Sequence, residues 1–216
     1  MNNQTEQKTD RKQKKRHPQK GEHGYFAWEK KKRIAIVALM YGIVLLIYFT
    51  GIARYHTRKN AFTLIAILGI LPAAKWTVSM IMACIQKPFS EEAYQVTERI
   101  AKGLTRGYEL CVTAEEGRLA LDAVVVTGSQ VVAYTRANRG LFEFMQKHIA
   151  KILSSNGLYG MNVRIFLDLN RYTERISALA QDPDRYRTNL KNAADAVHEG
   201  ESRDEAVMRV IRNISI

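Results

Sequence analysis

Two long apolar segments lie near the start of the chain, and shorter amphipathic segments follow them. Residues 34–53 are twenty consecutive residues without a charge, flanked by Lys30–Arg33 on one side and Arg54 on the other. At 1.5 Å per residue a helix of this length spans roughly 30 Å, the thickness of a hydrocarbon core. A buried helix in a soluble protein of this size is rarely apolar on every face. We therefore predict a transmembrane helix over residues 33–54.

The second apolar segment, residues 61–84, contains Pro72 and Lys75. Pro72 removes one hydrogen bond from the helical ladder, and a Lys near the middle of a span costs about 2.5–3.5 kcal/mol on insertion scales. The apolar remainder outweighs this cost, so we predict a second transmembrane helix over 61–86, reached through a short external loop, 55–60. Two geometries stay open for Lys75. It lies inside a full span and snorkels, which we favour, or the membrane part ends just before it.

The basic excess of the chain is confined to its first part. The 216 residues carry a net charge of +12. Residues 1–33 hold 11 Lys/Arg against 4 Asp/Glu, residues 34–86 hold 4 against none, and residues 87–216 hold 18 against 17. The part after the membrane is therefore nearly neutral, and its charge gives no support for nucleic-acid binding.

The distribution of Lys and Arg also predicts the orientation of the chain. The positive-inside rule places the N-terminal arm in the cytoplasm, because the loop between the spans carries far fewer Lys and Arg residues. An even number of spans returns the C-terminus to the same side. We expect a multi-pass protein of the cell membrane with both termini in the cytoplasm.

The N-terminal arm, residues 1–32, is polar and rich in Lys and Gln, and is predicted to be disordered. We interpret it first as a determinant of topology. Its cations are also candidates for contact with anionic lipid, at roughly 1 kcal/mol per charge near the surface. This candidate lipid-facing cluster consists of Arg11, Lys12, Lys14, Lys15, Arg16, Lys30, Lys31, Lys32 and Arg33.

Residues 87–170 combine helical and strand patterns. Ser90, followed by Glu91 and Glu92, has the composition of a helix start. An amphipathic helix is predicted over 141–154, and Gly128-Ser129 reads as a hairpin turn. The strand patterns cover residues 108–113, 119–127, 130–135 and 162–168.

Residues 171–216 are predicted to form a helical C-terminal extension. Apolar residues at helical spacing indicate one helix through Leu190, Ala194 and Val197, and a last helix opens with a capping box from Ser202 to Glu205. The predicted fold class is a membrane-anchored α/β protein. A two-helix transmembrane hairpin precedes a small mixed-sheet α/β domain with a helical tail.

Four segments between Glu91 and Asp168 carry a family resemblance. They read EEAYQVTERIAKGL, RLALDAVVVTGSQVVAYTR, FEFMQKHIAKIL and NVRIFLD. In order and wording they resemble the NERD group of nuclease-related domains, within the PD-(D/E)XK restriction-endonuclease-like fold. In that family an Asp begins the first strand of the central hairpin, and a Glu, one further residue and a Lys end the second. The resemblance implies that the acids hold a divalent metal and that the Lys assists attack on a phosphate.

The family motif is only partly present in this chain. Asp122 matches the family Asp, and Glu98 matches a Glu of the opening helix, which makes both of them candidate metal ligands. Tyr134–Arg136 occupy the Glu-any-Lys positions, so the second acid is missing and the Lys is replaced by Arg. Glu143 and Lys147, four residues apart on one helical face, either supply the missing groups or form an exposed salt bridge.

Three functions follow as hypotheses. The first, which we favour, is a non-catalytic, membrane-anchored cytoplasmic module without a cofactor, a binding or scaffold domain for an unidentified protein partner. The second is an active, divalent-metal-dependent nuclease that uses Asp122 with Glu143 and Lys147. The third is a subunit of a membrane complex that acts through its helix hairpin. No Gly-rich phosphate loop, nucleophile elbow or Cys/His cluster in the sequence supports another enzyme class.

Overall fold

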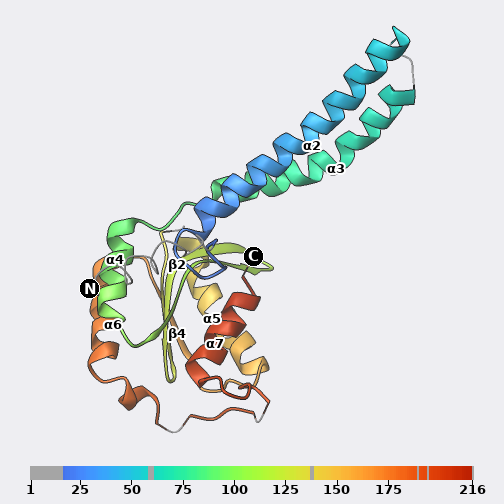
Figure 1. Ribbon diagram of the computed structural model, residues 1–216. Coiled ribbons are helices and arrows are strands. Elements are labelled where there is room, and N and C mark those ends of the chain that lie inside the picture. Colours follow the sequence, from blue (N-terminus) through green and yellow to red (C-terminus); the bar gives the residue numbers. More distant parts are fainter. Residues whose placement is uncertain (1–16, 58–60, 137–138, 189, 194, 216) are drawn as a thin grey trace, which may run out of the picture.

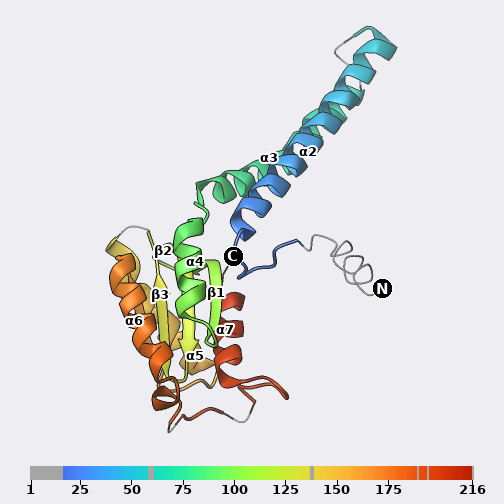
Figure 2. The same cartoon turned by 60° about the vertical axis from the view of Figure 1, so that its left-hand side comes forward.

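The computed structural model describes residues 17–57, 61–136, 139–188, 190–193 and 195–215. Two long helices project together from a domain in which helices cover a β-sheet (Figure 1). The first helix begins at that domain and the second returns to it (Figures 1 and 2).

The two projecting helices are α2 (Tyr25–Tyr55) and α3 (Ala61–Ile85), and each is long and apolar enough to cross a membrane. Within the described part of the chain, every exposed large apolar side chain except Val96 and Tyr159 belongs to one of these two helices. Monomeric soluble proteins rarely expose an apolar surface of this extent. The exposed apolar surface is therefore concentrated on the helix pair, and the domain buries its own apolar residues.

Small and polar side chains hold α2 and α3 against each other. A Cβ atom added at Gly69 would lie 3.1 Å from the side chain of Val44, so the helices approach closely at this level. Ala73 is fully buried, and the hydroxyl of Thr77 donates a hydrogen bond of 3.3 Å to that of Tyr41. The helix predicted over 61–86 is confirmed, and it continues through the proline in its middle.

The start of α2 differs from the prediction. Residues 25–32 are helical, whereas the sequence pattern predicted a disordered arm up to residue 32. The helix is extended because Phe26 is buried against the domain and because Arg33 forms an ion pair with Glu29 one turn earlier. Residues 1–16, with the basic cluster that begins at Arg11, lie outside the described residues.

The domain contains a four-stranded sheet in the order β1-β2-β3-β4. The first three strands are antiparallel, and the last runs parallel to β3 after a helical crossover. Gly128, with a φ of 56°, makes the tight turn between β2 and β3. The strands are β1 (Thr105–Ala114), β2 (Gly117–Thr127), β3 (Gln130–Tyr134) and β4 (Asn162–Phe166).

Two helices cover each face of the sheet, which gives a three-layer arrangement (Figure 2). One buried cluster joins the sheet to α5 (Phe142–Ser155) and α7 (Arg203–Asn213). The other joins it to α4 (Glu91–Ile100) and α6 (Leu169–Gln181). Short 3₁₀ turns at Arg139–Leu141 and Asp184–Tyr186 complete the connections. The small mixed-sheet α/β domain predicted from the sequence is confirmed.

The C-terminal part is not an extension of this domain. The predicted boundary at residue 171 falls inside α6, and both α6 and α7 supply buried residues to the two cores. The capping box is present, with Ser202 and Glu205 each bonded to the other's backbone N–H.

The helix predicted through Leu190 and Val197 is wrong for the described residues of that segment, and Ala194 lies outside them. The backbone there bonds to the loop after α5 instead. Tyr159 donates its N–H to the carbonyl of Lys191, and Ala193 donates its N–H to the carbonyl of Gly157. These bonds use backbone groups that an internal helix would have required.

Candidate functional site

The carboxylate of Asp122 is the group that the family resemblance singles out, and Arg136 covers it. Asp122 directly precedes the part of β2 that pairs with β3, and its side chain is buried. Arg136 follows β3 by two residues and donates from Nη2 to Oδ1 at 2.6 Å and from Nε to Oδ2 at 3.0 Å. Its backbone N–H also donates to Oδ2, at 2.9 Å. The carboxylate thus accepts three hydrogen bonds from one residue.

This ion pair has the fork geometry that makes Arg–carboxylate pairs strong. The hydrogen bonds to Asp122 raise the pKa of Arg136 above its ordinary value, and the negative charge of Glu109 acts in the same direction. A metal ion at Asp122 would have to displace the guanidinium and leave it without its partner. Arg136 therefore occupies the carboxylate that the resemblance makes a candidate metal ligand.

Tyr134 takes the position of the second family acid and belongs to an aromatic cluster. Its ring centre lies 6.1 Å from that of Phe89 and 5.5 Å from that of Tyr172, and its side chain is buried. Burial raises the pKa of Tyr134, and the nearby charge of Asp122 adds to this effect. The site therefore holds a neutral phenol where a second carboxylate would be needed.

The other predicted site residues are not gathered around Asp122. Glu143 and Lys147 lie on the exposed side of α5, whereas the opposite side of that helix packs into the core. No contact between them and Asp122 is present among the described side chains. Likewise, no group of three or more His, Cys, Asp or Glu side chains within the described ranges is arranged to hold a metal ion.

Glu98 lies in a different place and has a different task. It accepts two hydrogen bonds of 2.7 Å from the guanidinium of Arg106 and a third, also of 2.7 Å, from the hydroxyl of Tyr108. Burial alone would raise the pKa of Glu98, but the hydrogen bonds from Arg106 and Tyr108 outweigh burial and hold the pKa below its ordinary value. Glu98 therefore binds two side chains at the start of β1, those of Arg106 and Tyr108, and is not a partner of Asp122.

Glu109 is a buried acid that the sequence reasoning missed. It lies opposite Asp122 in the β1–β2 ladder, between the pairs Tyr108–Ala123 and Leu110–Leu121. Its backbone has a φ of 50°, a left-handed conformation that is uncommon for a residue other than glycine. An acid between apolar residues in the middle of a predicted strand is the sequence signal that could have identified it.

The carboxylate of Glu109 binds the two places where the chain passes between the helix pair and the domain. Oε2 accepts a hydrogen bond of 2.7 Å from the backbone N–H of Phe26, in the first turn of α2. Oε1 accepts one of 3.0 Å from the backbone N–H of Phe89, between α3 and α4. Arg136 adds a further link, because its Nη2 donates to the carbonyl of Pro88 at 2.7 Å.

A cavity of about 350 Å³ lies beside Asp122, between the end of α3 and the β1–β2 hairpin. We call it the Asp122 cavity. Its walls are apolar on the α3 side and charged on the side of the sheet. The lining residues are Met82, Ile85, Gln86, Lys87, Cys111, Arg118, Ala120, Asp122 and Arg136.

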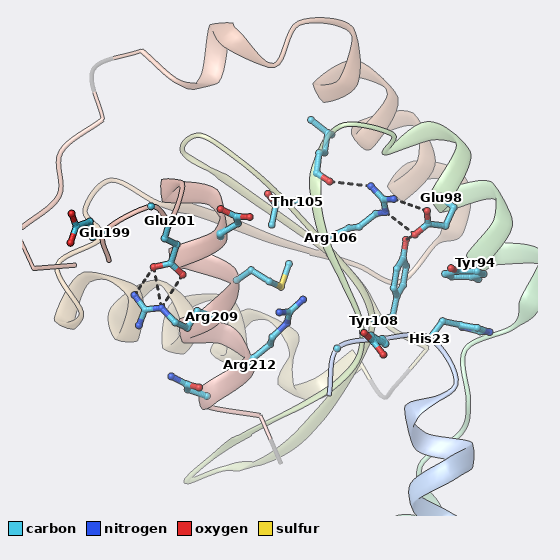
Figure 3. A pocket seen from close by; sticks show the side chains of 17 residues that line it. His23, Tyr94, Glu98, Thr105, Arg106, Tyr108, Glu199, Glu201, Arg209 and Arg212 are labelled. Atoms are coloured by element: carbon cyan, nitrogen blue, oxygen red, sulfur yellow. Dashed lines mark hydrogen bonds and ion pairs between the residues drawn. The ribbon is translucent and has the colours of Figure 1, made fainter. Parts of the chain in front are cut away.

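A larger cavity, of about 940 Å³, lies elsewhere, between the start of β1, α4 and α7 (Figure 3). Two ion pairs dominate it: Arg106 with Glu98, and Arg209 with Glu201 at 3.0 Å. Near the pair of Arg106 and Glu98, the rings of His23 and Tyr94 stack with centres 4.1 Å apart. In each pair the two charges neutralise each other, and of the two pairs the one between Arg106 and Glu98 involves β1.

Comparison of the chain with models of protein families, with curated proteins and with solved structures finds no match.

Proposed function

We propose that this protein is a non-catalytic, membrane-anchored module in which a nuclease-like domain serves as a binding or scaffold domain at the cytoplasmic surface. The anchor is the hairpin of α2 and α3. Its support is the confinement of exposed apolar side chains to these helices, which are of membrane-spanning length.

The charges at the two ends of the hairpin support the orientation. Lys30–Arg33 lie at the end of α2 that meets the domain, and α3 returns to the domain at its C-terminal end. By the positive-inside rule this end faces the cytoplasm, together with the domain and both chain termini.

The order of elements in the domain supports the nuclease-like ancestry. A helix, three antiparallel strands, a crossover helix and a parallel strand follow one another, as the resemblance implies. Asp122 lies within β2, directly before the segment that pairs with β3, and Arg136 follows the end of β3 by two residues, so both lie near the end of the central hairpin to which the resemblance assigns the site.

The observation that carries the non-catalytic proposal is the ion pair between Asp122 and Arg136. A nuclease of this kind needs converging acids to hold a metal ion and a cation that is free to reach the phosphate. Here the one acid and the cation bind each other, and the place of the second acid is taken by a buried tyrosine. The site is thereby converted into a structural contact between the sheet and the linker that follows α3.

Calorimetric titration of Mn²⁺ into the full-length protein in detergent, with a parallel DNA and RNA cleavage assay, tests this proposal. We expect no saturable binding and no cleavage. Saturable binding that is lost in Asp122→Ala, together with metal-dependent cleavage, would contradict it.

If the wild-type protein binds no Mn²⁺, a designed double variant shows whether a metal site at this place would have been detected. Tyr134→Glu combined with Arg136→Lys restores the family's Glu-any-Lys sequence beside Asp122. We expect this variant to gain Mn²⁺ binding. Tyr134→Gln combined with Arg136→Lys introduces a side chain of similar size without the carboxylate, and is expected to bind no metal. Circular dichroism of both variants establishes that they are folded.

A further inference from the structure

A second cavity lies next to the Asp122 cavity, between the helix pair and the β1–β2 hairpin. Its volume is about 280 Å³, and it shares Met82, Gln86 and Arg118 with the Asp122 cavity. We call the two together the junction groove. The second cavity is lined by Glu29, Arg33, Lys75, Val78, Ser79, Met82, Ala83, Gln86 and Arg118.

The junction groove carries an excess of positive charge. Both of its acids are already paired, Glu29 with Arg33 and Asp122 with Arg136. Lys75, Lys87 and Arg118 also line the groove, and none of the three forms an ion pair with a described residue. All three are exposed, and Lys87 and Arg118 line the Asp122 cavity together, so an anionic ligand there would meet two unpaired cations.

The opposite wall of the groove is apolar and belongs to α3. Val78 is 56% exposed, Met82 is 43% exposed and Ile85 is 67% exposed. These residues continue the apolar surface of the hairpin up to the domain. Lys75 lies on the same helix, yet it lines a cavity together with Glu29 and Arg33, at the end of the hairpin that meets the domain.

We propose that the junction groove binds one anionic phospholipid, whose phosphate meets Arg118 and Lys87 and whose acyl chains lie along Ile85, Met82 and Val78. The arrangement matches both parts of such a ligand, with cations at the level of the head groups and an apolar helix face below them. This inference rests on the membrane insertion of the hairpin in the proposed function. It differs from lipid contact by the N-terminal arm, because Lys87 follows the end of α3 and Arg118 belongs to β2.

The test uses the full-length protein in vesicles of equal parts phosphatidylcholine and phosphatidylglycerol. The protein is extracted with a mild detergent, and the phospholipids that it retains are measured by mass spectrometry. We expect retained phosphatidylglycerol to be enriched over the vesicle composition. Arg118→Ala and Lys87→Ala should each lower the ratio of retained phosphatidylglycerol to retained phosphatidylcholine about fivefold, the equivalent of about 1 kcal/mol per cation.

Two further variants separate the groove from general surface charge. Arg118→Lys preserves the positive charge and should retain the enrichment. Lys151→Ala removes an exposed cation of α5, outside the groove, and should leave the enrichment unchanged. Retention at the vesicle composition, or an equal loss in Lys151→Ala and Arg118→Ala, would overturn the inference.

The origin of the phosphate is tested separately. Glycerol phosphate, which has the phosphate but no acyl chains, should bind far more weakly than phosphatidylglycerol to the detergent-extracted protein. Equal affinity would overturn the role assigned to the apolar wall. Insertion is followed independently by resistance of the protein to alkaline carbonate extraction. A wild-type protein that is released by carbonate would overturn the proposed anchor, whereas an inserted protein without lipid enrichment would overturn only the lipid site.

Discussion

The carboxylate of Glu109 accepts a hydrogen bond of 2.7 Å from the backbone N–H of Phe26, and so fixes the first turn of α2 to the central sheet. The same carboxylate accepts the N–H of Phe89 at 3.0 Å. Phe26, Phe89 and Glu109 are all buried. One buried carboxylate therefore joins both places where the chain passes between the helix pair and the domain.

Glu109→Ala is expected to lower the free energy of unfolding by about 2–4 kcal/mol, because two buried N–H groups lose their acceptor. The measurement is chemical denaturation of the full-length protein in detergent, followed by circular dichroism. Glu116→Ala, in the exposed turn between β1 and β2, is the matched control and should change little. Equal effects of the two substitutions would show that Glu109 does not hold the hairpin to the domain.

Arg136→Ala is expected to destabilise the domain by about 2 kcal/mol, because it leaves the buried carboxylate of Asp122 without its cation. The value is below that of a fully buried pair, since the side chain of Arg136 is 38% exposed and water screens part of its charge.

A double-mutant cycle isolates the interaction between the two side chains. When Asp122→Asn is combined with Arg136→Ala, the loss should be smaller than the sum of the two single losses by about 1 kcal/mol or more. Urea denaturation of the four proteins supplies the cycle. Additive losses would mean that the two side chains contribute independently.

The hydrogen bonds that Glu98 accepts from Arg106 and Tyr108 predict a pH dependence of stability. The folded state holds the pKa of Glu98 below its ordinary value of 4.5. A group whose pKa is lower in the folded protein stabilises the fold above its unfolded pKa, and this stabilisation is lost as the pH falls through the folded value. Acidification from about pH 6 to about pH 3 should therefore cost wild-type more free energy of unfolding than Glu98→Gln, in which this group no longer titrates. Parallel acid curves for the two proteins would contradict the role given to the hydrogen bonds from Arg106 and Tyr108.

The capping box of α7 predicts a local effect on stability. Ser202→Ala should lower the free energy of unfolding by about 1 kcal/mol, because an N–H group in the first turn loses its side-chain acceptor. Thermal denaturation measures this loss. Ser155→Ala, at the C-terminal end of α5, removes a hydroxyl of the same size that caps no helix start, and should have a smaller effect. A larger loss in Ser155→Ala would contradict the expected importance of the cap.

The elements that the sequence predicted correctly are those whose determinants are local. Met145, Ile149 and Leu153 recur at helical spacing and form the buried side of α5. Gly128 reverses the chain between β2 and β3, and the capping box starts α7 at the expected place. In each case the residues that specify the element lie within a few positions of it.

The errors arose where a distant partner decides the conformation. Residues 25–32 are predicted as part of the polar arm that precedes them, although they begin with Tyr25, Phe26 and Trp28; they are helical, and the sheet supplies an acceptor for the N–H of Phe26. The segment around Leu190 has helical spacing, yet its backbone bonds to the loop after α5. Hydrophobic periodicity contains no information about such long-range hydrogen bonds.

The sequence drew attention to Asp122 and Arg136 through the family resemblance, but it did not predict the contact between them that the structure shows. The comparison of motifs identified Asp122 and Arg136 as the residues at the matching places. Their fourteen-residue separation gives no indication that the guanidinium lies on the carboxylate, which depends on how β2 and β3 pair and on the rotamer of the arginine. The role of Glu109 was missed because the two N–H groups that its carboxylate accepts, those of Phe26 and Phe89, lie 83 and 20 residues away along the chain.

The two places where the chain passes between the helix pair and the domain, at Phe26 and Phe89, also determine how movement of the hairpin reaches the domain. Only Gln86, Lys87 and Pro88 separate the end of α3 from the amide that Glu109 holds, and α2 has no linker at all before its clamped first turn. In the membrane-inserted state that we propose, a change in hairpin tilt imposed by a thicker or thinner bilayer is therefore transmitted to β1, because no long flexible connection separates the helices from the strand. The strand position that this movement reaches is Glu109, which lies opposite Asp122 between the pairs Tyr108–Ala123 and Leu110–Leu121.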